Sequence, residues 1–484
     1  MLRYLGQSEF GLFSLVNTTI AYFIVLDFGL GTAIIRYTAK YRAEEEKAKE
    51  EILHGMFLVF YMIIGAIAFL LAIVLILNIN RLFSNSLTAD ELNTSRKLMF
   101  LAAINLALSF PFSLYSSIVT AYERFIFAQG LQIVRMVINY LAMVGVLIIG
   151  YKAFGLILAT TICNILYSLC NLFYCTRCLK IKMRFKPFAK TNLLREIGIY
   201  SFFIFLSMIV DRLFWSTGQF LIGIIVGATS VAVFALSMQF ITAFYMPISA
   251  AVSSLFLPKV TKISIRDSGN RELSDLFIRV GRIQFIILAF FLSGFILYGQ
   301  QFINLWAGSD YSKSYLITLI VIIPLTVPLI QNLGISILQA KNKHAFRSIL
   351  YLVIAILNVL ISIPIIKIWG PIGCAIGTAI SFTIAHVVIM NFYYKFQLKL
   401  EIGKYWIEIV RIFPGVMLAF FFGLLFLQVY SAERPPGFVL NIIIYSAVYG
   451  IIVFFLGMNR FEKHIVLTFA GRIVTIVRPI RGLE

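Results

Sequence analysis

Long apolar segments recur along the whole chain, separated by short polar stretches. Each is about as long as the roughly 20 residues that a helix needs to cross a bilayer. Lipid offers no partner for an unpaired peptide group, so we expect these segments to be helices. Barrel strands of about ten residues would alternate strictly between apolar and polar positions, and the sequence shows no such alternation. Thirteen helices are predicted, at about residues 10–34, 55–79, 98–120, 129–150, 154–176, 197–224, 229–257, 277–299, 314–339, 348–368, 371–393, 406–429 and 438–457.

Composition supports an all-α polytopic membrane protein. Apolar residues make up 61% of the 484 residues and charged residues only 13%, whereas soluble domains carry about 25% charged residues. The first residues do not have the pattern of a cleavable signal peptide, so we expect the spans themselves to target the protein. The five cysteines include one C-x-x-C pair, Cys175 and Cys178, with no second pair or histidine cluster. We therefore expect no metal and no cofactor.

The net charge of +20 predicts an orientation. If the connections between helices are numbered in order, the odd ones and the C-terminal tail hold 31 basic residues, and the N-terminus and the even ones hold 8. The positive-inside rule places the richer side, with the C-terminus, in the cytoplasm. The charge thus needs no nucleic acid to explain it. Residues 39–51 are predicted to form a short, solvated, charged helix, and residues 462–482 an amphipathic helix on anionic lipid.

An internal repeat predicts two homologous lobes. Residues from 5 onward align with residues from 226 at an offset of 221, with Gly6 on Gly227, and the run from Ser117 aligns with the run from Ser336 at an offset of 219. Parallel repeats of this kind place substrate sites between lobes near the membrane midplane. The prediction is a five-helix lobe that lacks its opening helix, a six-helix lobe, two further helices and an amphipathic cytoplasmic tail. These divisions are residues 1–180, 190–400, 401–460 and 461–484.

Several motifs carry a resemblance to a known family. They are L-G-Q-S-E-F-G-L-F-S-L, L-D-F-G-L-G-T-A-I-I-R-Y, D-R-L-F-W-S-T-G-Q-F-L-I-G, I-N-L-W-A-G-S-D-Y and G-P-I-G-C-A-I-G-T. With them the whole chain resembles polysaccharide biosynthesis flippases, the Wzx-type O-antigen repeat-unit translocases of the multidrug/oligosaccharidyl-lipid/polysaccharide (MOP) exporter superfamily. The resemblance implies a fourteen-helix fold, here without its first helix, in the bacterial inner membrane. It also implies a polyprenyl-diphosphate oligosaccharide as substrate, membrane lipids and a coupling cation (H⁺ or Na⁺) as partners, and a monomer.

A diphosphate crossing an apolar slab needs fixed cations, and the planar fork of arginine can bind two phosphate oxygens at once. The two sets of 31 and 8 basic residues leave two of the 41 over, both inside predicted helices. They are Arg212, about halfway along helix 197–224, and Arg135, near the cytoplasmic end of helix 129–150. A structural ion pair is the alternative for Arg212, and snorkelling to the interface is the alternative for Arg135. Asp211 and Asp27 are candidates for charge balance or ion coupling, and a purely structural hydrogen bond is the alternative for Asp27.

Polar amides inside the spans are candidates for sugar contacts. Helix–helix hydrogen bonding is the alternative reading for each of them. They are Asn139, Gln219, Gln239 and Asn332.

Nucleotide-binding and hydrolase motifs are absent from the sequence, so we expect no enzyme, and an ion gradient or substrate flow as the energy source. Two other functions remain open. A MATE-like cation-coupled drug antiporter of the same superfamily would favour acidic intramembrane groups. A membrane polysaccharide polymerase or ligase would typically carry a large extracytoplasmic loop, whereas the longest here spans roughly residues 80–97.

Overall fold

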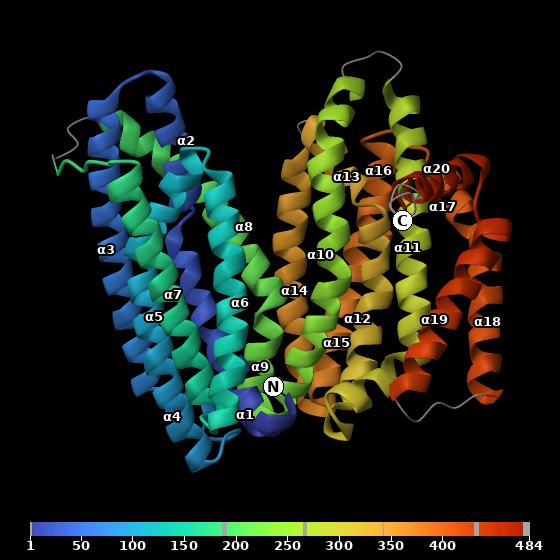
Figure 1. The fold of residues 1–484 in the computed structure, drawn as a ribbon, viewed down its shortest axis with the longest axis horizontal. Coiled ribbons are helices and arrows are strands. Elements are labelled where there is room, and N and C mark those ends of the chain that lie inside the picture. The colour runs from blue at the N-terminus through green and yellow to red at the C-terminus, as the bar shows by residue number, and fades with distance from the viewer. Residues whose placement is uncertain (1, 186–190, 265–268, 342, 430–434, 478–484) are drawn as a thin grey trace, which may run out of the picture. The chain divides into compact units, whose positions relative to one another are not determined.

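The computed structural model describes the chain except for residues 1, 186–190, 265–268, 342, 430–434 and 478–484 (Figure 1). Its regular elements in the described ranges are all helices. The first ones are α1 (Leu2–Phe23), η1 (Ile24–Asp27), α2 (Leu30–Ala43), α3 (Lys47–Leu77), α4 (Ile79–Phe83), α5 (Ala89–Ala121), α6 (Phe125–Ile149), α7 (Lys152–Phe173), η2 (Tyr174–Cys178), α8 (Thr191–Trp215) and α9 (Thr217–Ile225).

The later helices continue in the same way. They are α10 (Ala228–Ser264), α11 (Gly269–Trp306), η3 (Ser309–Tyr311), α12 (Lys313–Ile330), α13 (Leu333–Ala340), α14 (His344–Trp369), α15 (Pro371–Phe382), η4 (Thr383–Met390), α16 (Asn391–Phe396), α17 (Ile402–Val410), α18 (Phe413–Val429), α19 (Pro435–Ile452), η5 (Val453–Gly457) and α20 (Arg460–Val477). Twelve spans in the described residues are long and apolar enough to cross a membrane, or thirteen if α8 and α9 form one bent span. The predicted all-α polytopic class and its helix number are confirmed.

Three of the predicted helices are interrupted. The helix predicted at 10–34 breaks between α1 and α2, where Gly29 has a left-handed φ of 74° and a Cβ on it would lie 2.6 Å from the side chain of Ile204. The helix predicted at 197–224 bends by 46° between Trp215 and Thr217. The helix predicted at 314–339 ends at Ile330 and resumes at Leu333. These breaks depend on contacts with other helices, which an apolar segment length does not encode.

The separate charged helix predicted at residues 39–51 is wrong. Instead α2 runs to Ala43 and α3 starts at Lys47. Between them Glu45 has a left-handed φ of 57°, and the Glu46 N–H donates to the carbonyl of Tyr41 at 2.9 Å. The charged residues therefore surround a tight turn that joins two long helices.

The chain packs as two compact units. Unit 1 comprises Met1–Ala235 with Ala355–Cys374, and unit 2 comprises Leu236–Ile354 with Ala375–Glu484. The boundaries fall inside α10, α14 and α15. These units are defined by packing, whereas the predicted lobes were drawn from internal homology. The division into homologous lobes therefore stays a prediction.

Helix α5 lies at the centre of the unit 1 helices and packs against α1, α2, α3 and α7. A capping box starts it: the Thr88 hydroxyl accepts from the Glu91 N–H at 3.3 Å, and the Glu91 carboxylate accepts from the Thr88 N–H at 3.0 Å. A Cβ on Gly65 of α3 would lie 2.7 Å from the Ala107 carbonyl of α5, so glycine permits this close helix contact.

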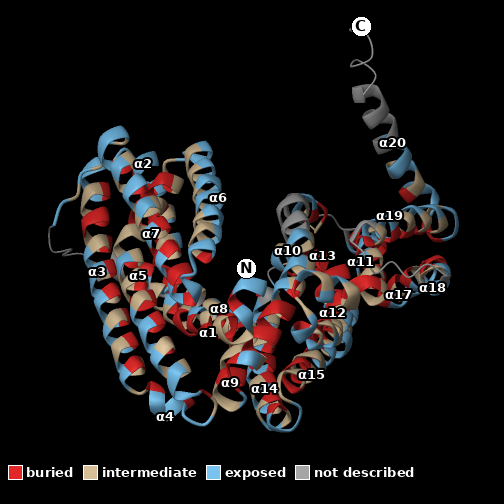
Figure 2. Cartoon of the chain, turned by 60° about the horizontal axis from the view of Figure 1, so that its bottom comes forward, coloured by how far each residue is buried: buried red, intermediate tan, exposed pale blue. Residues whose placement is uncertain are grey.

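Helix α6 is the most exposed long helix of unit 1, as Figure 2 shows by its mostly pale and tan ribbon. Leu147 is its one buried residue. Its exposed residues are mainly large and apolar, including Ile126 and Ile133. An apolar exposed surface of this kind is expected where a helix faces lipid.

In unit 2 a buried arginine fixes the start of α20. Arg282 of α11 donates through Nε and Nη2 to the Glu462 carboxylate at 2.7 and 3.0 Å. Nη1 of Arg282 donates to the backbone carbonyl of Glu408 at 2.6 Å and to the Glu408 carboxylate at 3.1 Å. Nη2 also donates to the Gly457 carbonyl at 3.0 Å. The side chains of Arg282 and Glu462 are only 4% and 3% exposed. We call this group, Arg282 with Glu408, Gly457 and Glu462, the arginine clasp.

The arginine clasp explains how the tail is attached. The described part of the predicted tail is helical as α20, and residues 478–484 lie outside the described residues. Its position on a membrane surface stays a prediction.

Candidate translocation site

Arg135 of α6 lies in a cluster of amides and one aromatic ring in unit 1. Its Nη1 donates to Asn164 Oδ1 of α7 at 3.0 Å, and its guanidinium lies 4.9 Å from the ring centre of Tyr167. Asn164 in turn donates from Nδ2 to Asn105 Oδ1 of α5 at 3.4 Å. No carboxylate among the described residues forms an ion pair with Arg135. Because its partners are neutral, the half-buried guanidinium keeps its full positive charge for an anion.

Asn139 lies one turn further along α6 and on the same face as Arg135. Its Oδ1 is buried and has no hydrogen-bond partner in the described part of the chain. The structure thus brings one predicted phosphate ligand and one predicted sugar contact onto one face of α6. Sequence reasoning did not select Asn164 or Tyr167. The sequence did show that both residues carry a polar group within the helix predicted at 154–176.

Asp27 ends η1, at the break between α1 and α2. Its Oδ1 accepts from the Tyr61 hydroxyl at 2.8 Å, and its Oδ2 accepts from the Gly31 N–H at 3.4 Å. Tyr61 is fully buried, and Asp27 is half-buried. Within the described ranges no basic side chain pairs with this carboxylate. The hydrogen bonds match the structural reading of Asp27, and they leave its negative charge available to a cation.

Arg212 lies in the last turn of α8, just before the 46° bend, and so near the middle of the bent span that α8 and α9 would form together. A cation at a helix C-terminus is favoured by the exposed carbonyls. Arg212 is half-buried while Asp211 is exposed, as expected for neighbours about 100° apart on a helix. Beside the bend, the Tyr22 hydroxyl of α1 donates to Thr217 Oγ1 at 2.7 Å.

The remaining amides occupy different environments. Gln219 is half-buried in α9, two residues after Thr217, and Gln239 is exposed on the unit 2 part of α10. Asn332 is 7% exposed at the break between α12 and α13, and its Nδ2 has no partner among the described residues. The burial of Asn332 favours a role inside the helix bundle over contact with a sugar.

The α12–α13 break is braced by a second amide network in unit 2. Asn391 Oδ1 accepts from Gln331 Nε2 and from Trp406 Nε1, both at 2.9 Å. In the part of the chain that the structure describes, no group of three or more His, Cys, Asp or Glu side chains is arranged to hold a metal ion.

The chain is similar to several solved membrane transporters. A lipid II flippase, MurJ, in an inward closed conformation matches with a TM-score of 0.66 at 17% identity, over 92% of this chain and 95% of that one. An inward-facing multidrug resistance MATE family transporter of the MOP superfamily also gives 0.66, at 14% identity, over 83% and 92%. A MOP superfamily transporter from Pyrococcus furiosus gives 0.54 at 15% identity, over 82% and 89%. At these identities the likeness shows the fold, which is that of MOP transporters.

No protein of curated function matches the chain by sequence. A family model described as "Polysaccharide biosynthesis protein" matches residues 1–264 of the 484. The match covers more than half of the chain and includes the elements that carry Asp27, Arg135 and Arg212. The chain therefore belongs to the polysaccharide biosynthesis protein family.

Proposed function

We propose that this protein moves polyprenyl-diphosphate-linked oligosaccharide repeat units from the inner to the outer leaflet of the bacterial inner membrane by alternating access. Family membership and the MOP fold support transport of a lipid-linked saccharide. The observation that carries the proposal is Arg135, a guanidinium inside a membrane helix whose contacts, Asn164 and Tyr167, are neutral. Arg135 lies near the middle of α6, and at a helix centre a charge costs roughly 2.5–3.5 kcal/mol, which favours a functional role for it.

The roles follow from the groups present. Arg135 and Arg212 would bind diphosphate oxygens, and Asn139, with an unpartnered amide oxygen, would accept a hydrogen bond from a sugar hydroxyl. Gln219 and Gln239 would add amide contacts. Asp27, with only neutral donors around it, would take a coupling H⁺ or Na⁺, and Asp211 would balance the charge of the arginines.

We further propose that the protein works as a monomer without catalysing a covalent reaction. The cytoplasmic C-terminus rests on the asymmetry of 31 against 8 basic residues across the two sets of connections. An ion gradient or the removal of the product on the outer side would drive net movement.

The direct test is reconstitution into proteoliposomes that contain a polyprenyl-diphosphate oligosaccharide. A membrane-impermeant glycosidase added outside measures how fast saccharide moves between leaflets. We expect movement that Arg135→Gln and Arg212→Ala abolish while protein abundance stays intact, and that Arg135→Lys partly restores. Arg96→Gln is the matched control, because this arginine is exposed and its side chain bonds Asn80 alone among the described residues, at 3.3 Å.

The outcome discriminates between the functions. Unchanged movement in Arg212→Ala removes Arg212 from the site, and unchanged movement in both variants rejects an arginine-based phosphate site. Proteoliposomes that leave the saccharide in place but exchange a cationic drug for H⁺ or Na⁺ would identify an antiporter instead. In cells, deletion of the gene should leave completed repeat units on the inner leaflet and remove the surface polymer.

A further inference from the structure

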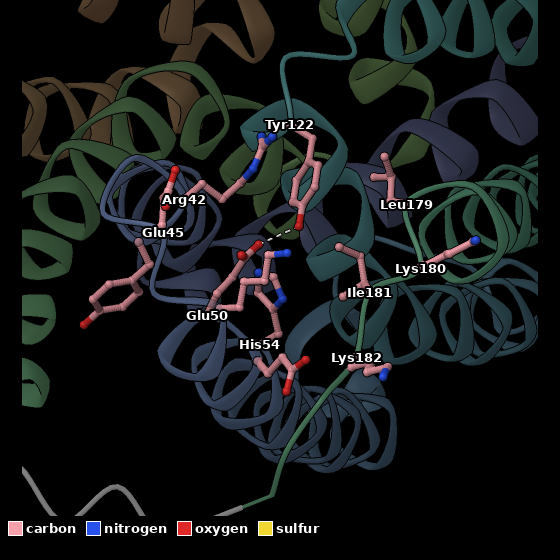
Figure 3. A pocket seen from close by; sticks show the side chains of 12 residues that line it. Arg42, Glu45, Glu50, His54, Tyr122, Leu179, Lys180, Ile181 and Lys182 are labelled. Carbon is pink, nitrogen blue, oxygen red and sulfur yellow. Dashed lines mark hydrogen bonds between the residues drawn. The ribbon is translucent and has the colours of Figure 1, made fainter.

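A cavity of about 680 Å³ lies in unit 1, and none of Arg135, Asp27 and Arg212 lines it (Figure 3). It lies between the turn that joins α2 to α3, the end of α5 and the segment Leu179–Lys182. Its volume is in the range of roughly 300–1,000 Å³ typical of small-molecule pockets. The charge count assigns this end of the unit to the cytoplasm.

The floor of the cavity carries a buried carboxylate. Glu50 is 7% exposed and accepts at Oε1 from the Tyr122 hydroxyl at 2.7 Å. Burial, followed by the hydrogen bond to Glu50, raises the pKa of Tyr122 above its ordinary value of 10.0, so the hydroxyl stays protonated and donates. No basic group of the described chain pairs with Glu50. A carboxylate can accept several hydrogen bonds, so Glu50 keeps most of its capacity.

A buried imidazole adjoins this carboxylate on the floor. His54 is 1% exposed, and its Nε2 is 3.1 Å from the Thr38 hydroxyl. Its Nδ1 has no hydrogen-bond partner among the residues described. In the tautomer whose Nε2–H donates to Thr38, Nδ1 is a second acceptor close to Glu50. A buried negative charge with a spare neutral acceptor is suited to a cation that carries several N–H donors.

The rim of the cavity has the opposite charge. Lys47, Lys180 and Lys182 are exposed, and among the described residues their side-chain amines have no hydrogen-bond or ion-pair partner. Arg42 is held at the rim, because its guanidinium lies 3.7 Å from the Tyr122 ring centre and donates to the Ala121 carbonyl at 3.3 Å. Several free amines around one opening favour a phosphate.

The carboxylates at the rim do not cancel this charge. Glu51 is already paired with Arg184 at 2.7 Å, which leaves Glu45 as the one unpaired rim acid in the described lining. The Arg184 N–H also donates to the Glu51 carbonyl at 3.0 Å. The same contacts hold the backbone near Lys180 and Lys182 against α3, so both lysines line the same cavity as Glu50 and His54.

We propose that this cavity binds a phosphorylated primary amine, with the ammonium on Glu50 and His54 and the phosphate on the rim lysines. The phosphoethanolamine group has this chemistry, either as the head group of an aminophospholipid or as the free molecule. A primary ammonium offers three N–H donors, whereas the quaternary ammonium of phosphocholine offers none. The site should therefore discriminate between the two, and it is independent of the saccharide that the protein moves.

The test is calorimetric titration of the purified full-length protein in phospholipid-free detergent. The probes are phosphoethanolamine, phosphocholine, ethanolamine and inorganic phosphate. We expect phosphoethanolamine to bind at least about tenfold more tightly than the other three, since a hydrogen bond to a charged group contributes about 1.5–3 kcal/mol. Equal affinity for phosphoethanolamine and phosphocholine, or no binding of any probe, would overturn the proposal.

Variants assign the two halves of the site. Glu50→Gln should weaken phosphoethanolamine about tenfold or more and leave inorganic phosphate unaffected, whereas Lys180→Gln with Lys182→Gln should weaken both. Tyr122→Phe keeps the ring under Arg42 and offers a milder change should Glu50→Gln fail to fold, with a smaller loss expected for phosphoethanolamine alone. Lys395→Gln, an exposed lysine of unit 2, is the control. Unchanged binding in both Glu50→Gln and Tyr122→Phe would refute the floor contact.

Native mass spectrometry separates the two sources of the ligand. Protein extracted from mixed phosphatidylethanolamine, phosphatidylcholine and phosphatidylglycerol bilayers should retain phosphatidylethanolamine selectively, and Glu50→Gln should lose it, if the ligand is a head group. Calorimetric binding without such retention would assign the site to the free molecule. Neither measurement uses saccharide movement as its readout, so failure here and failure of the proposed function are distinguishable.

Discussion

Removal of the positive charge from the arginine clasp should destabilise unit 2 strongly. Arg282→Met keeps an apolar chain of similar length but deletes all the hydrogen bonds from the guanidinium to Glu462, Glu408 and Gly457. Glu462, 3% exposed, would then be a buried carboxylate with only the Asn459 N–H, at 2.8 Å, as a remaining donor. Breaking a buried pair by removing one partner costs about 3–5 kcal/mol, and we expect a loss in this range.

The assay is the free energy of unfolding of the purified protein in mixed micelles, titrated with sodium dodecyl sulfate and followed by circular dichroism. Lys404→Met is the matched control, because this lysine pairs with Asp275 at 3.3 Å and Glu401 at 3.2 Å but is 51% exposed. Exposed pairs contribute little, so no measurable change is expected there.

A double variant separates the pair from the packing. Arg282→Met with Glu462→Met replaces both charges by apolar side chains, and such replacements are often neutral. We therefore expect the double variant to be more stable than Arg282→Met alone. A loss below about 1 kcal/mol for Arg282→Met, the scale of an exposed pair, would refute the reasoning. The reasoning would also be refuted if the double variant lost as much stability as Arg282→Met and Glu462→Met lose separately, added together.

Two further predictions concern unit 1. Asp27→Asn keeps an acceptor for the Tyr61 hydroxyl but removes the charge, so saccharide movement should lose its dependence on an imposed H⁺ or Na⁺ gradient. Tyr61→Phe is the control and should retain that dependence. A gradient response unchanged in Asp27→Asn would exclude Asp27 from coupling. Gly55→Ala would place a Cβ 2.4 Å from the Arg184 carbonyl and should cost about 1–3 kcal/mol in the same unfolding titration. Gly130→Ala on α6, with no atom within 4 Å, should instead be neutral or stabilising by up to about 1 kcal/mol, and equal effects of the two changes would contradict the packing argument.

The number and class of the helices could be predicted from sequence because lipid imposes one requirement on every span, a long apolar segment with internally satisfied peptide groups. The breaks could not be predicted. Gly29 adopts a left-handed conformation against Ile204, a residue 175 positions away in sequence. The bend before Thr217 likewise lies where Tyr22 of α1 bonds that residue. Such features depend on which helices meet, and segment length carries no information about that.

The same limit applies to the polar residues. A charge inside an apolar segment is conspicuous, so Arg135, Arg212 and Asp27 could be selected. Their partners Asn164 and Tyr61 could not be selected, because these uncharged residues belong to other helices and nothing in the sequence links them to Arg135 or Asp27. The count of basic residues by connection also included Arg282 on the cytoplasmic side, and Arg282 is buried. A charge count predicts the side of the membrane and carries no information on burial.

The arginine clasp also has a consequence for biosynthesis. Arg282 and Glu462 are 180 residues apart in sequence. At about 5–20 residues per second, the ribosome delivers the glutamate roughly 10–40 s after the arginine. Glu408 follows Arg282 by 126 residues and can pair with it first, so in the last part of that interval Arg282 has one carboxylate partner and still lacks Glu462. Pairing with α20 then completes the arginine clasp, and a polypeptide that stops before Glu462 lacks the buried ion pair that closes it.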